Sequence, residues 1–197
     1  MAAQALESLD RAATRIGGVL GIYPANPIAV VLHTGEQFRD ITRAPVWAAG
    51  AFDGTIRIPM RGALVQVTEL DRVLAHELTH ALVYMLAQRR VPTWLNEGLA
   101  AALERDGQGQ TGSRVEAMPE PVPLRTLQKS FGTLTGAGAQ RAYATSALAV
   151  HRLLEDAGDV ALANLLRDLG QGADFETAFA HRMQRSFSDF DASLTRP

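Results

Sequence analysis

Apolar residues recur every three or four positions along most of the chain, which is the spacing of an amphipathic helix. This period predicts helices over residues 4–20, 68–88, 94–104, 140–156, 159–169, 173–182 and 187–195. Thr68 followed by Asp71 resembles a capping box at the start of the second helix. Pro92 separates the second helix from the third, because proline interrupts helical hydrogen bonding. The pattern predicts a largely helical chain.

Two stretches before residue 62 have the character of strands. Residues 28–32 form a short apolar run rich in β-branched side chains, which predicts a buried strand. Residues 45–61 predict a hairpin, because the segments 47–52 and 55–58 flank Asp53-Gly54, a strong turn signal. Pro59 has no N–H to donate, so the ladder must stop or lie at an edge there. We expect one edge of the segment 47–52 to be unpaired and open to an extended peptide.

The order of these elements predicts the fold class. Strands come early and helices follow, which favours an α+β fold over alternating strand–helix units. At 197 residues the chain fits one domain over 1–197. Its expected parts are an N-terminal helix and sheet (1–62), two motif helices (68–104), a loop (105–139) with a short helical patch near 124–131, and a helical C-terminal part (140–197).

Composition and charge exclude several classes of function and partner. The net charge is −2 and the 19 basic residues are scattered, so neither nucleic acid nor a membrane surface is an expected partner. The absence of cysteine excludes disulfides, a thiolate metal site and a cysteine nucleophile. We expect no signal peptide within the chain and no membrane span, since no apolar run approaches the ~20 residues required. The compartment, the oligomeric state and the presence of an upstream segment stay open.

The predicted helix 68–88 contains His76-Glu77-Leu78-Thr79-His80. Four residues on a helix amount to about 400° of rotation and ~6 Å of rise, so both imidazoles leave one face a turn apart. That separation suits one zinc ion, which binds histidine nitrogen at ~2.0–2.1 Å. Glu77 is offset by about 100°, close enough to touch a water molecule on the metal. Random placement of the chain's residues gives about 0.006 matches to this pattern, so two structural histidines explain it poorly.

A third ligand is expected from Glu97. It follows His80 by 17 residues, beyond Pro92, so that its helix can fold back beside the first. Its neighbours include Trp94 and Leu99, and a carboxylate in such apolar surroundings must be paired or bound to metal. A catalytic zinc site has three protein ligands and an open position. The sequence therefore predicts one zinc ion per chain, bound by His76, His80 and Glu97.

The segments 76–80 (HELTH) and 94–100 (WLNEGLA) resemble those of the gluzincin metallopeptidases, the clan of thermolysin and the M1 aminopeptidases. More narrowly, they resemble the compact bacterial peptidase MA-like families. The resemblance implies a zincin-like fold, the same three ligands, Glu77 as general base, and a peptide or protein substrate. One position departs from it: thermolysin-like members have an aspartate four residues after the glutamate ligand, which orients a zinc histidine, and this chain has Ala101. Another group must take that role.

Hydrolysis also requires a partner for the charge that develops on the substrate oxygen. In the resembling clan a Tyr or His on a later helix serves, which points to Tyr143, although a core tyrosine is an equally good interpretation. His151 is the weaker alternative, eight residues later on roughly the same helical face.

Zinc-dependent peptide hydrolysis is the leading function. The runner-up is a catalytically silent zincin-like domain that binds a partner peptide in its cleft, against which the intact Glu77 argues. A third possibility is a helical interaction module that carries the motifs by chance. The substrate sequence and the choice between endo- and exopeptidase stay open.

Overall fold

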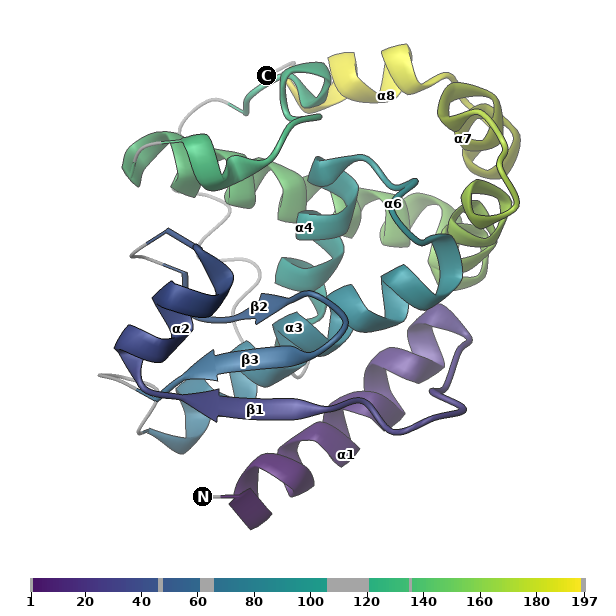
Figure 1. The fold of residues 1–197 in the computed structure, drawn as a ribbon. Helices are drawn as coiled ribbons and strands as arrows, with labels where there is room; N and C mark the ends of the chain where they lie inside the picture. The colour runs from purple at the N-terminus through teal and green to yellow at the C-terminus, as the bar shows by residue number, and fades with distance from the viewer. Residues whose placement is uncertain (1, 46–47, 61–65, 106–120, 135, 196–197) are drawn as a thin grey trace.

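The structure is a computed structural model that describes residues 2–45, 48–60, 66–105, 121–134 and 136–195 (Figure 1). The described chain is mostly helical and contains one small three-stranded sheet, as expected for an α+β chain. No helix in the described ranges is both long enough and apolar enough to cross a membrane.

The N-terminal part contains the sheet. Its elements are α1 (Ala2–Leu20), β1 (Val30–His33), α2 (Gly35–Thr42), β2 (Ala51–Phe52) and β3 (Ile56–Pro59). The strand order is β1-β3-β2, with β1 parallel to β3 (Val30 opposite Ile56) and β2 antiparallel to it (Phe52 opposite Ile56). The predicted hairpin is therefore confirmed, with Gly54 in the turn at φ 105°. The central strand stops at Pro59.

Three details of this part differ from the sequence prediction. The first strand begins two residues later than expected, at Val30. The strand predicted over 47–52 is only Ala51–Phe52, and its expected start at position 47 lies outside the described residues. Helix α2 was not predicted, although Thr34 and Gln37 form a reciprocal capping box at its start.

The two motif helices are confirmed as α3 (Val67–Ala87) and α4 (Thr93–Leu103). The predicted capping box at Thr68 is wrong: the N-cap of α3 is Gln66, which makes no side-chain capping bond, and Thr68 lies inside the first turn. Pro92 is the N-cap of α4, where its missing N–H costs no helical hydrogen bond.

Helices dominate the C-terminal part. The predicted helical patch near 124–131 is two short 3₁₀ turns, η2 (Leu124–Thr126) and η3 (Phe131–Thr133), and residues 106–120 of the predicted loop lie outside the described part. The predicted helices 140–156 and 159–169 are joined in α6 (Gly136–Gly170), which is interrupted at Gly158 (φ 79°, ψ 171°). Helices α7 (Phe175–Met183) and α8 (Phe187–Leu194) confirm the two predicted C-terminal helices, although α7 begins two residues later than expected.

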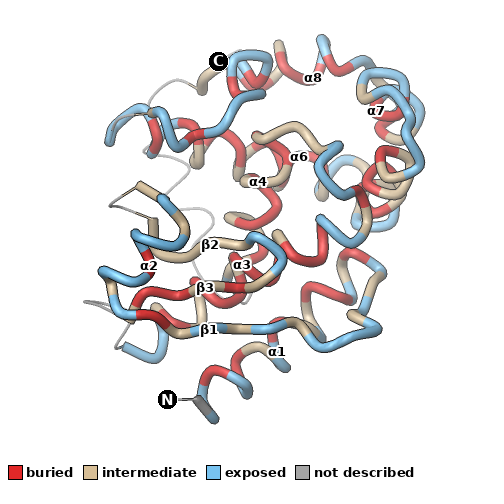
Figure 2. The backbone as a smooth tube through the Cα atoms, viewed as in Figure 1, coloured by how far each residue is buried: buried red, intermediate tan, exposed pale blue. Residues whose placement is uncertain are grey.

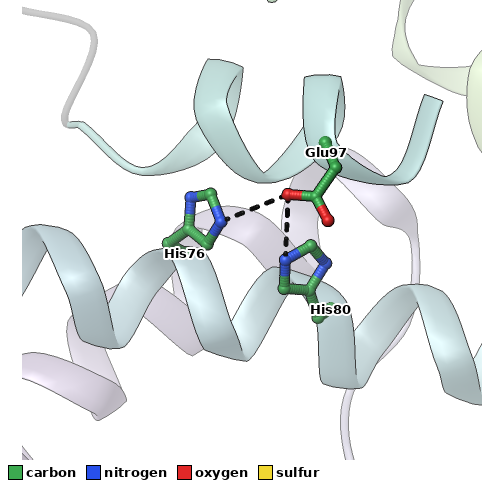
Figure 3. Close-up of side chains that lie close together, drawn as sticks. All are labelled: His76, His80 and Glu97. Atoms are coloured by element: carbon green, nitrogen blue, oxygen red, sulfur yellow. Dashed lines mark ion pairs between the residues drawn. The ribbon is translucent and has the colours of Figure 1, made fainter. Parts of the chain in front are cut away.

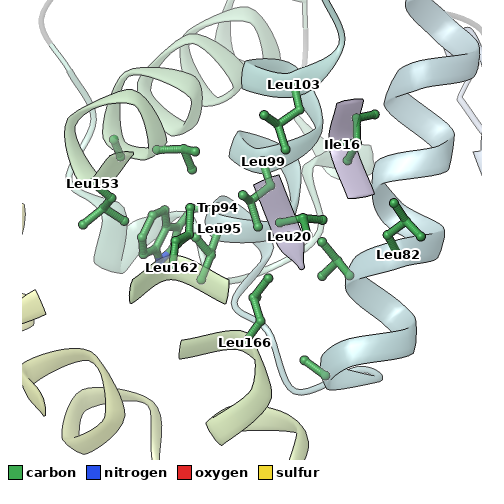
Figure 4. Close-up of a cluster of buried hydrophobic side chains, with 14 of the residues drawn as sticks. Ile16, Leu20, Leu82, Trp94, Leu95, Leu99, Leu103, Leu153, Leu162 and Leu166 are labelled. Atoms are coloured by element: carbon green, nitrogen blue, oxygen red, sulfur yellow. The ribbon is translucent and has the colours of Figure 1, made fainter. Parts of the chain in front are cut away.

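Helix α4 lies in the middle of the core. Much of α4 is buried (Figure 2). Its Trp94, Leu95 and Leu99 are fully buried and lie among residues of α1, α3 and α6 such as Leu20 and Leu82 (Figure 4). The Trp94 ring stacks on a phenylalanine of α8, with the two centroids 5.8 Å apart. Burial of this apolar face fixes α4 beside α3, which positions the candidate site.

Candidate metal centre

The structure brings the three predicted ligands together. His76 and His80 lie one turn apart on α3, and Glu97 on α4 points at both imidazoles (Figure 3). Oε2 of Glu97 is 3.7 Å from Nε2 of His76 and 3.6 Å from Nε2 of His80. One donor atom from each residue lies within 4.8 Å of the other two. These three residues could therefore hold a metal ion.

The position of Glu97 depends on its neighbour Gly98. A Cβ atom at Gly98 would overlap the carbonyl group of Ser146 in α6, so only glycine lets α4 and α6 approach this closely. The close approach buries the apolar face of α4, while the carboxylate of Glu97 leaves from the face that looks toward α3. It also sets α6, and with it Tyr143, beside the site.

The three candidate ligands are coupled electrostatically. Burial opposes the charge of Glu97, but the adjacent His80 and His76, together with a hydrogen bond from the Tyr143 hydroxyl, hold the pKa of its carboxyl below the usual value. Burial also opposes protonation of His76, yet hydrogen bonds to Glu104 and Glu97 raise its pKa to about 10. A metal ion bound here would have to displace that proton.

Glu104, the C-cap residue of α4, is a functional candidate that the sequence interpretation missed. Its Oε2 atom lies 3.1 Å from Nδ1 of His76 and 2.7 Å from Nη1 of Arg72, and Arg72 in turn contacts Glu69 at 2.6 Å. A carboxylate on the second ring nitrogen leaves Nε2 of His76 free to face Glu97. Glu104 is therefore the side chain placed to orient His76, which Ala101 cannot do.

A sequence signal for Glu104 exists. It follows Glu97 by seven residues, which is about 700° of helical rotation, so the two glutamates lie within about 20° of one another on α4. For His80 no equivalent partner is present: within the described ranges, its buried Nδ1 atom has no hydrogen-bond partner.

Glu77 lies in the same cleft and outside the ligand triad. Its side chain is buried, and this burial raises the pKa of the carboxyl. The backbone of Gly50, just before β2, packs directly against it, since a Cβ atom there would be 2.6 Å from Oε1 of Glu77. The carboxyl group is therefore enclosed between the sheet edge and α3.

Tyr143, the candidate partner for the developing charge, also lines the cleft. Its hydroxyl hydrogen-bonds to Glu97, and burial together with this carboxylate raises the pKa of the phenol. Its ring packs edge-on against Phe131, with centroids 5.2 Å apart. His151 is not among the residues that line the cleft, so the structure favours Tyr143 over His151 as a group able to reach a ligand.

The cleft around the triad has a volume of about 500 Å³. One wall is the segment 50–54, which includes β2, and the other is formed by α3 and the start of α4. Neither a comparison with models of known protein families nor one with curated proteins finds a match to this chain.

Proposed function

We propose that this chain is a zincin-like, gluzincin-type metallopeptidase that hydrolyses peptide bonds with one zinc ion held by His76, His80 and Glu97. The observation that carries the proposal is the approach of three donor atoms to within 4.8 Å of one another, beside the buried Glu77, in one cleft. The resemblance of the two motif segments to the gluzincins supports the same assignment.

The donor set fits zinc. Ligand atoms about 2.0–2.1 Å from a tetrahedral ion lie about 3.3–3.5 Å from each other. The two histidine-to-glutamate distances of 3.7 and 3.6 Å differ from that by a few tenths of an ångström. Two imidazoles and one carboxylate suit zinc better than magnesium or calcium, which prefer oxygen ligands alone. Three protein ligands also match the catalytic rather than the structural type of zinc site.

Glu77 acts as the general base in this proposal. When bound, a zinc ion lowers the pKa of a water molecule toward ~7 and polarises the carbonyl group to be attacked. Glu77 takes the proton from that water and passes it to the departing amine. Its burial suits this task, because a carboxylate with a raised pKa accepts a proton more readily.

Tyr143 serves as the partner of the developing negative charge. Its hydroxyl donates to Glu97 in the structure, so the donor is already directed into the cleft. When substrate is bound, the hydroxyl turns to the carbonyl oxygen and stabilises the charge that forms there.

The edge of β2 provides a place for the substrate backbone. β2 pairs with β3 on one side, and no strand of the described part pairs with its other side. Gly50 and Ala51 line the cleft beside Glu77, and their small size lets a peptide come close. An extended substrate can join this edge as an added strand, which would lay its backbone across the triad.

The direct test is the digestion of a mixed peptide library by zinc-loaded protein, read by mass spectrometry. We expect the wild type to cleave peptides, and Glu77→Gln to lose ~10²-fold or more of the activity while keeping its zinc. Unchanged turnover in the variant would remove Glu77 from the mechanism. Peptide binding without cleavage by the wild type would instead favour the silent, partner-binding domain.

A further inference from the structure

The cleft extends beyond the metal triad toward the C-terminal end of α3. There it is lined by Phe52 from β2, Tyr84 from α3 and Val91 from the connection to α4. None of these three side chains takes part in the proposed chemistry. They are the apolar side chains of a stretch that Gln88 and Arg89 also line, whereas ionisable side chains line the end near the triad.

Phe52 and Tyr84 form an aromatic pair across the cleft walls. Their ring centroids are 5.9 Å apart and the ring planes are inclined at 65°. The pair is not sealed from solvent, since Tyr84 is 44% exposed and Phe52 is partly exposed. Single exposed apolar residues are ordinary on protein surfaces. Two rings that belong to one ligand-sized cavity are a different case, because a bound apolar group would remove both from water.

The helix geometry places this pair close to the bond to be cut. Tyr84 follows His80 by four residues, so it lies on the same face of α3, about 6 Å further along the axis. An extended peptide advances ~3.3–3.4 Å per residue, and alternate side chains point the same way. A substrate that lies along the edge of β2 therefore brings a side chain to the aromatic pair within about two residues of the scissile bond.

The charged residues at this end of the cleft narrow further which substrate side chains it can accept. Arg89 lines the same stretch of the cleft, and it forms no ion pair or side-chain hydrogen bond with any residue that the structure describes. Asp53, the acidic residue nearby, is already paired with Arg57 at 2.9 Å. A lysine or arginine side chain of the substrate that reached this stretch would meet the positive charge of Arg89, while the carboxylate of Asp53 is already paired with Arg57.

We propose that Phe52 and Tyr84 form a specificity subsite that binds a large apolar side chain, aromatic or leucine-like, of the substrate and disfavours basic ones. The inference rests on the proposed peptidase function and names its substrate class: peptides with a bulky apolar residue within two positions of the cut, always on the same side. Pockets of this kind discriminate by about 10–200-fold between a filled and an unfilled side-chain position.

The test variants are placed at partly exposed positions of α3, where a substitution should not prevent folding. Tyr84→Ala removes one wall of the subsite at a partly exposed position, so the protein should fold and keep its zinc. Met85→Ala is the matched control, because Met85 is the next residue of the helix, is 42% exposed and does not line the cleft. Circular dichroism and zinc content check that both variants are intact.

Two measurements test the subsite. In the first, library digestion maps the residues around each cut, and we expect a bulky apolar residue at one fixed position in the wild type and in Met85→Ala. In Tyr84→Ala that preference should fall by about tenfold or more. In the second, zinc-loaded Glu77→Gln protein is titrated with blocked pentapeptides that differ only in a central Phe, Leu, Ser or Lys. We expect Phe and Leu to bind about tenfold more tightly than Ser or Lys.

The two measurements separate the subsite from the peptidase. Cleavage with equal preference in Tyr84→Ala and wild type, or a preference for basic residues, would overturn the subsite and leave the peptidase intact. Apolar binding preference without any cleavage would keep the subsite and overturn the peptidase. If the protein neither cleaves peptides nor distinguishes them in binding, both proposals are wrong.

Discussion

Replacement of Glu104 by glutamine tests how the proposed site would hold its metal. Glu104 accepts hydrogen bonds from His76 and from Arg72, and only the His76 bond bears on a ligand. A hydrogen bond to a charged group contributes about 1.5–3 kcal/mol and a neutral one about 0.5–1.5 kcal/mol. Glutamine keeps a neutral acceptor, so the change costs about 1–1.5 kcal/mol, or about tenfold in zinc affinity. Glu104→Ala removes the acceptor and should cost about 10–100-fold.

A competition titration of zinc against a chromophoric chelator, at fixed pH and salt, measures these affinities. Glu69→Gln is the matched control, because Glu69 contacts the same Arg72 but is not bonded to His76. We expect it to change zinc affinity by less than about twofold, as for a partly exposed ion pair. An unchanged affinity in Glu104→Gln would refute the orienting role. An equal loss in Glu69→Gln would assign the effect to the ion-pair network as a whole.

Three further outcomes are expected. Tyr143→Phe should lower kcat by ~10–10³-fold in steady-state assays with little change in melting temperature, whereas a loss of stability at constant kcat would make it a core tyrosine. Gly98→Ala should destabilise the protein by about 1–3 kcal/mol in urea unfolding, because the new methyl overlaps Ser146; an unchanged midpoint would contradict this packing. A hydrogen bond from Arg182 lowers the pKa of Asp168, so this pair stabilises the fold above the ordinary carboxyl pKa and loses its effect as pH falls through the lowered one. Asp168→Asn should accordingly lower the melting temperature at pH 7 but not near pH 2, and an equal difference at both pH values would refute the assignment.

The helices were the predictable part of the fold. A 3.6-residue period marks an amphipathic helix from local sequence alone, and Pro92 and Gly158 mark the breaks that the structure has. The sheet was harder to predict from the sequence, because strand pairing joins residues that lie far apart in the chain. Nothing near Val30 shows that it lies parallel to Ile56, and the short helix between them was missed despite its capping box at Thr34.

The candidate site was likewise predictable only in part from the sequence. The proximity of the three candidate ligands was predictable because His76 and His80 are related by one helical turn and Glu97 lies in a distinctive apolar segment. The approach of Glu97 to both histidines could not be predicted from local sequence, because it depends on how α4 packs. That packing rests on long-range contacts such as the contact of Gly98 with α6. Glu104 escaped the prediction because its role depends on the approach of a second helix to His76, although its helical phase pointed to the same face.

The metal content of the purified protein tests the central claim most directly. Inductively coupled plasma mass spectrometry, after dialysis against trace zinc, should find about one zinc ion per chain in the wild type. His80→Ala and Glu97→Ala should each lose most of that zinc, while circular dichroism shows that they remain folded. Full zinc occupancy in both variants, or a folded wild type that binds no zinc, would contradict the assignment of His76, His80 and Glu97 as a catalytic zinc site.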